Sequence, residues 1–129
     1  MNRNELIRRL ASFVYDERVA VVYLFGSVAR GMAMGASDVD VAVLYSNALP
    51  QKLENCGFDL QDRLTTALQL PVDLIVLNNA PSDLVHRVLK DGVVVFEFDR
   101  SARVAFEVQR RNEYFDLLPH LLRYRGLAS

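Results

Sequence analysis

The run Val19–Phe25 is the feature of this sequence that most constrains its fold, because it contains only β-branched, aromatic and aliphatic residues. An unbroken apolar run of this length predicts a strand that is buried on both faces, since a half-exposed strand would alternate apolar and polar residues. The run stops at Gly26. The rest of the chain must therefore cover both faces of the sheet that contains this strand.

The other predicted elements supply that cover. Further strands are expected at residues 38–45, 72–77 and 93–98, and apolar residues at helical spacing predict helices around residues 6–14, 53–68, 84–89 and 102–118. The order helix, strand, strand, helix, strand, helix, strand, helix predicts an α/β or α+β fold with a single mixed β-sheet flanked by helices. The direct step between the first two strands permits either an antiparallel pair or a short crossover.

Several residues indicate where helices begin and end. Asn2 and Asp99 are expected to cap the first and last helices, and Pro50 to open the helix that carries Leu53, Cys56, Leu60, Leu64, Ala67 and Leu68. Gly92 fits a helix stop, and Pro119 is expected to interrupt the closing helix. That helix is expected to bury Ala102, Phe106, Phe115 and Leu118.

Length and composition limit the class of protein. A chain of 129 residues corresponds to one domain, residues 1–129, with residues 100–129 forming a closing helix and a basic tail. The formal net charge of −1 argues against direct nucleic-acid binding. No apolar run reaches the roughly 18–20 residues of a membrane span, and no signal-like segment follows Met1, so a cytoplasmic protein is expected. Cys56 is the single cysteine and is expected to be a small buried apolar residue.

Three aspartates lie in or beside strands that are otherwise apolar, where aspartate is disfavoured. Asp38 and Asp40 are two residues apart, so on a strand both side chains project from the same face, and Asp73 stands near the start of the third strand. Such carboxylates repel one another unless a cation lies between them, and their hard oxygen atoms suit Mg²⁺. A carboxylate from a neighbouring strand would complete a site for two metal ions. The alternative is that Asp38 begins a strand and Asp40 pairs with an arginine.

The segment before these aspartates favours a phosphate site. Gly26 and Ser27 follow directly on the buried strand, and Arg30-Gly31 comes next. A glycine at the end of a strand lets successive backbone N–H groups point outward as an anion nest, and a short helix that begins there adds its dipole. The Ser27 hydroxyl and amide would then hold the terminal phosphates of a nucleotide whose metal ions lie on Asp38 and Asp40.

These residues resemble the polymerase-β-like nucleotidyltransferase superfamily. The resemblance rests on Gly26-Ser27, ten intervening residues, Asp38-Val39-Asp40 and a later strand aspartate at Asp73. More narrowly, the chain is similar to the minimal nucleotidyltransferases that act as antitoxins beside HEPN-domain ribonuclease toxins. The resemblance implies that Asp38, Asp40 and Asp73 hold Mg²⁺, with Asp73 as general base or metal ligand, and that Gly26, Ser27 and Arg30 bind the co-substrate ATP.

The resemblance also implies a reaction and a partner. AMP would be transferred from ATP to a tyrosine of a HEPN toxin, which is neutralised, in a complex with that toxin or as a homo-oligomer. Two alternatives stay open: the acceptor is a small molecule, or the chain is a non-catalytic antitoxin that covers the toxin. The small apolar gap around Met32 and Met34 departs from the more polar segment of many relatives.

The remaining candidates are weaker. His86 and His120 have no metal-ligand companion at useful spacing, so structural or surface roles are expected. The aromatic and basic residues near the end of the chain either contact adenine or a partner, or form a helix core with a solvated face; they are Tyr114, Phe115, Tyr124, Arg110, Arg111, Arg123 and Arg125.

Overall fold

A computed structural model describes residues 2–29, 31, 38–46 and 53–128, with side chains except at 53–56 and 124–128. The expectations for Arg30, Met32, Met34 and Pro50 lie outside the described residues, as does the one for the Cys56 side chain. Within the described ranges, no helix is both long and apolar enough to cross a membrane.

The centre of the molecule is a four-stranded sheet in the order β3-β2-β1-β4. Its strands are β1 (Val19–Phe25), β2 (Val39–Tyr45), β3 (Val72–Val76) and β4 (Val93–Glu97). β1 is antiparallel to both β2 and β4, whereas β2 and β3 run parallel. The prediction of a single mixed sheet is confirmed, and the step between the first two strands makes an antiparallel pair. β3 and β4 each end one residue earlier than expected.

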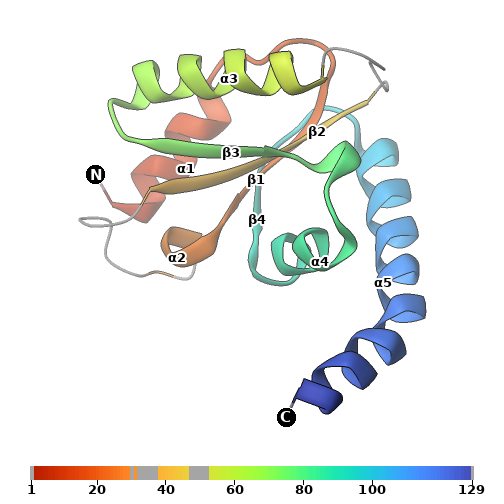
Figure 1. Cartoon of the computed structure of the whole chain (residues 1–129). Coiled ribbons are helices and arrows are strands. Elements are labelled where there is room, and N and C mark those ends of the chain that lie inside the picture. Colours follow the sequence, from red (N-terminus) through yellow and green to blue (C-terminus); the bar gives the residue numbers. More distant parts are fainter. Residues whose placement is uncertain (1, 30, 32–37, 47–52, 129) are drawn as a thin grey trace.

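Helices cover both faces of this sheet (Figure 1). One face packs against α1 (Arg3–Ser12) and α3 (Leu53–Leu68), and the other against α4 (Ser82–Asp91) and α5 (Arg100–Ala128). The single turn α2 (Gly26–Ala29) follows β1, and the 3₁₀ turn η1 (Leu77–Asn79) follows β3. Every residue of β1 is buried, as the unbroken apolar run predicts.

The sheet separates two apolar clusters. On the first face, Leu6 and Leu10 of α1 pack with Leu60, Leu64 and Leu68 of α3. On the second face, the cluster joins β1 and β2 to α4 and the start of α5; its buried members are Ala20, Val21, Tyr23, Phe25, Ala42, Leu44, Leu77, Val85 and Val88. The second face also carries the candidate site, because Asp40 alternates with Ala42 and Leu44 along β2.

The predicted caps are present. The Asn2 side chain accepts a hydrogen bond from the amide of Glu5, and the Asp99 side chain accepts one from the amide of Ala102, both at the N-terminus of a helix. Gly92 ends α4 and donates its N–H to the carbonyl of Val88.

Two expectations about the closing helix were wrong. α5 continues through Pro119 to Ala128 instead of ending before the proline. A proline removes one helical hydrogen bond and crowds the preceding turn, which kinks a helix without having to end it; Figure 1 shows α5 bending in its last part. Phe115 is 58% exposed instead of buried, whereas the neighbouring Tyr114 stacks on His86 of α4, so Phe115 projects from another side of α5.

Candidate active site

Strand pairing places two of the predicted aspartates side by side. Asp40 is the register partner of Phe25 on β1 and of Asp73 on β3, so it lies in the middle of the three strands. Asp38 comes directly before β2, two residues from Asp40. Gly26 comes directly after Phe25, at the same end of the sheet. Residues from three separate segments of the chain therefore meet at one edge of the second sheet face.

These residues line a single cleft of about 430 Å³. Five of the six residues predicted for the site are among its lining: Gly26, Ser27, Asp38, Asp40 and Asp73. The sixth, Arg30, lies outside the described residues. The rest of the wall comes from the strand residues Phe25 and Ile75 and from α4, which contributes Leu84, Arg87 and Asp91.

Gly26 lies against the Asp40 carboxylate. Its φ angle of 77° belongs to the left-handed region that favours glycine, and a Cβ at this position would overlap the side chain of Asp40. Glycine is thus required here for two reasons, the backbone conformation and the close approach of the carboxylate. The contact joins the bend after β1 to the acidic residues of β2.

Negative charge is concentrated around Asp40, and Arg87 is the basic residue in the described lining of the cleft. Burial raises the pKa of Asp40 above its usual value, and the negative charges of Asp73 and then Asp38 raise it further. Among the residues that the structure describes, none of these three carboxylates forms an ion pair with a basic side chain. The alternative in which Asp40 pairs with an arginine therefore finds no support in the described residues.

The donor atoms of the cleft fit a hard divalent cation. Asp38, Asp40 and Asp73 supply carboxylate oxygen atoms, which Mg²⁺ prefers. Within the described part of the chain, however, no group of three His, Cys, Asp or Glu side chains is gathered closely enough to hold a metal ion.

The α4 side of the cleft was not predicted from the sequence. Leu84, Arg87 and Asp91 are spaced by three and four residues, which places them on one face of α4 next to the buried Val85 and Val88. This spacing was the available signal, but it does not distinguish a cleft wall from a solvated helix face.

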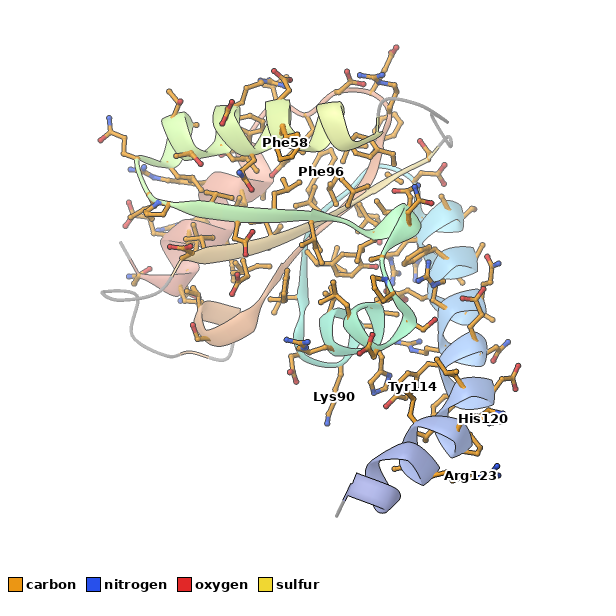
Figure 2. The ribbon with its side chains drawn as sticks, in the orientation of Figure 1. Phe58, Lys90, Phe96, Tyr114, His120 and Arg123 are labelled. Carbon is orange, nitrogen blue, oxygen red and sulfur yellow. The ribbon has the colours of Figure 1, made fainter. Side chains whose placement is uncertain are left out.

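Neither histidine is among the residues that line the cleft. His86 stacks on Tyr114, with ring centroids 3.7 Å apart and planes inclined by 5°, and this contact joins α4 to α5. Figure 2 shows Tyr114 on the side of α5 that faces α4 and His120 further along α5. Tyr114 therefore contributes to helix packing. This agrees with the interpretation of this aromatic group as a helix core with a solvated face.

Comparison with known proteins agrees with the fold. The mixed sheet with helices on both faces is the architecture of minimal nucleotidyltransferases. Residues 8–101, which include all four strands and every described residue of the cleft, match the family described as "Polymerase beta, Nucleotidyltransferase". The chain therefore belongs to the polymerase-β nucleotidyltransferase family.

Individual relatives are similar over most or all of the chain. Protein adenylyltransferase MntA of Shewanella oneidensis is 32% identical over 92 residues, which cover 71% of this chain and 63% of that relative's length. A chain of a toxin–antitoxin crystal structure with AMP-PNP is 25% identical, with a TM-score of 0.74 and 100% of both chains covered. A chain of the complex of tri-AMPylated S. oneidensis HEPN toxin with MNT antitoxin shares the fold, at 23% identity, a TM-score of 0.68, and 99% and 97% of the two chains.

Proposed function

We propose that this chain transfers AMP from ATP to a tyrosine hydroxyl of a HEPN ribonuclease toxin and so neutralises it. The observation that carries the proposal is the convergence of Gly26, Ser27 and the three aspartates in one cleft of a polymerase-β nucleotidyltransferase. Similarity to a protein adenylyltransferase supports the AMP transfer, and similarity to a toxin–antitoxin structure with AMP-PNP supports both the partner and ATP.

The reaction is an in-line displacement at the α-phosphorus of ATP. A new bond forms between the tyrosine oxygen and the α-phosphorus. The bond between the α-phosphorus and the oxygen that bridges it to the β-phosphorus breaks, and pyrophosphate leaves with that oxygen. Such a step needs positioning and charge neutralisation more than a nucleophile from the protein. Gly26 and Ser27 border the cleft at the end of β1, where their backbone N–H groups and the Ser27 hydroxyl would bind the phosphates.

Asp38, Asp40 and Asp73 are the residues that would hold Mg²⁺, and to do so they would have to come closer together than they lie among the described residues. When bound, the metal ions supply charge for the phosphates and lower the pKa of the attacking hydroxyl. Asp73 lies on β3, on the opposite side of Asp40 from Gly26. This position supports a role on the acceptor side, where Asp73 would take the proton of the hydroxyl or would help to hold an ion that favours its release. Arg87 faces the same cleft and adds positive charge for the phosphates.

The position of the label in ATP tests the proposal. ATP labelled at the α-phosphate should transfer its label to the toxin in the presence of Mg²⁺, and ATP labelled at the γ-phosphate should not. Asp38→Asn and Asp73→Asn variants should each lose at least about 99% of the transfer, because one ligand or base is missing from a coupled site. Transfer of the γ label, or full transfer by both variants, would overturn the assignment. Neutralisation of the toxin by both inactive variants would indicate that covering the toxin is sufficient.

A further inference from the structure

A second cavity opens directly beside the cleft. It measures about 330 Å³ and lies where α3, β3 and the start of α4 meet. Phe58 of α3, Val76 of β3 and Pro81 before α4 form much of its apolar wall. Ile75 and Leu84 line both this cavity and the acidic cleft, so the two spaces are neighbours that share these two side chains.

The position of this cavity relates it to the acceptor, not to the phosphates. Gly26 follows β1, Asp40 lies on β2, and Asp73 lies on β3, which is the edge strand of the sheet. The second cavity contains residues of β3 and none of β1 or β2. A nucleotide with its phosphates at Gly26 therefore leaves the β3 side of the cleft open for the incoming acceptor.

The spacing along β3 fits a phenol side chain. Asp73 and Ile75 are two residues apart and face the same cleft, which separates them by about 7 Å on a strand. An aromatic ring that packs on Ile75 and Leu84 therefore directs its hydroxyl toward Asp73. Aromatic rings bury a large apolar area, and the hydroxyl of tyrosine needs a polar partner at one end. The apolar wall next to a carboxylate supplies both.

We propose that this cavity is the acceptor subsite and that it binds the toxin segment that carries the target tyrosine. The tyrosine ring lies on Ile75 and Leu84, and apolar neighbours in the same segment contact Phe58 and Val76. The proposal rests on the proposed function and specifies its substrate: a tyrosine flanked by apolar residues in an accessible segment. Phe58 is 66% exposed, so its ring is accessible to a bound segment.

Two matched variants test the subsite. Phe58→Glu places a charge in the apolar wall, whereas Phe98→Glu makes the same change at a residue 69% exposed that follows β4, at the opposite edge of the sheet. Figure 2 shows Phe58 on α3. Because both side chains are exposed, neither variant should unfold the protein. Phe58→Glu should raise the KM for the toxin about tenfold or more, and Phe98→Glu should leave it within about twofold.

Nucleotide binding identifies the occupant. The Kd for AMP-PNP should be the same in the parent and in Phe58→Glu, since the phosphates bind on the β1 side. A weaker Kd for AMP-PNP would show that the cavity holds the adenine ring and would overturn the proposal. Equal KM values for the toxin in the two variants would overturn it as well.

Binding of 4-methylphenol separates the subsite from the proposed function. This compound is the analogue of the tyrosine side chain. With AMP-PNP bound to the protein, it should shift the methyl resonances of Ile75 and Leu84 in the parent. The same shifts should be much smaller in Phe58→Glu. If the parent does not label the toxin but these shifts occur, the proposed function fails while the aromatic subsite stands. If the toxin is labelled and no shift occurs, the subsite is wrong.

Discussion

Gly26 and Asp40 are in direct contact, with the Asp40 carboxylate in the place that a Cβ at residue 26 would take. A Gly26→Ala substitution must therefore move the carboxylate or the bend after β1. A displacement of about 1 Å at a reacting centre can reduce a rate roughly 100-fold, so AMP transfer by Gly26→Ala should fall by at least that factor. The measurement is the initial rate of label transfer from α-labelled ATP.

Gly31 provides the matched control for this substitution. Its φ angle of 82° is also left-handed, but a Cβ there would meet no atom within 4 Å. Both alanine variants should lose about 1–2 kcal/mol of stability to backbone strain. Only Gly26→Ala should lose transfer beyond what reduced stability explains; equal rates in the two folded variants would show that the contact with Asp40 has no catalytic importance.

Arg87 is expected to contribute to nucleotide affinity. Its side chain lines the acidic cleft, whereas Lys90 on the same helix is not among the lining residues and extends from α4 in Figure 2. Arg87→Ala should raise the KM for ATP about tenfold, because a charge-assisted contact with phosphate is lost. Lys90→Ala should leave it nearly unchanged, and a comparable rise in both variants would indicate a general effect of charge.

Tyr23 connects the sheet to α5 through Glu107. The Tyr23 hydroxyl donates to Glu107 Oε1 at 2.8 Å, and Arg103 Nη1 donates to Glu107 Oε2 at 3.0 Å. Tyr23→Phe should lower the free energy of unfolding by about 1 kcal/mol, since Glu107 keeps Arg103 as a partner. Glu107→Ala should cost more, roughly 2–3 kcal/mol, because it leaves the Tyr23 hydroxyl without its acceptor. Urea unfolding checks both values; the reverse order would contradict this description of the network.

Asp16 gives a pH dependence whose direction is fixed by its partner. Hydrogen bonds from Arg18, whose Nε lies 2.8 Å from Asp16 Oδ1, lower the pKa of Asp16 from 3.8 to about 2. A carboxylate whose pKa is lower in the folded than in the unfolded protein stabilises the folded state when the pH is above its pKa in the unfolded protein. It loses that contribution as the pH falls through its pKa in the folded protein. Asp16→Asn should therefore be less stable than the parent at pH 5, by less than about 1 kcal/mol because the pair is exposed, and should converge with it near pH 2.

An Arg18→Gln background provides the control for Asp16. Without the guanidinium, Asp16 keeps the hydrogen bond from the backbone N–H of residue 18, so the effect of Asp16→Asn on stability at pH 5 should be smaller than in the parent. An effect as large at pH 2 as at pH 5, or one that is undiminished in this background, would show that the guanidinium is not responsible.

Most of the fold follows from local patterns in the sequence. The unbroken apolar run of β1 requires two covered faces, and the helix caps at Asn2 and Asp99 act within a few residues. The buried strand and both caps can therefore be predicted without the tertiary structure. The pair Asp38 and Asp40 can likewise be recognised from the sequence, because burying charged residues in a strand is costly unless they bind a partner or an ion. Their meeting with Asp73 depends on the parallel pairing of β2 and β3, which the sequence left open.

The features that the sequence did not predict depend on long-range placement. Arg87 lines the cleft only because α4 packs against the second face of the sheet, and its helical spacing is equally typical of a solvated face. The continuation of α5 through Pro119 depends on a balance between one lost hydrogen bond and the remaining turns of the helix. The second cavity is formed by three elements that are separate in sequence, so no local sequence motif predicts it.

The central claim is that the carboxylates of the cleft direct transfer of AMP to the toxin. Its most direct test is the intact mass of the purified toxin after incubation with this protein, ATP and Mg²⁺, in parallel with an Asp40→Asn variant that retains the shape of the side chain. The parent should increase the toxin mass by one or more AMP units, and the tryptic map should place them on tyrosine, while the variant should leave the mass unchanged. An unmodified toxin with the parent, or equal modification with Asp40→Asn, would contradict the claim.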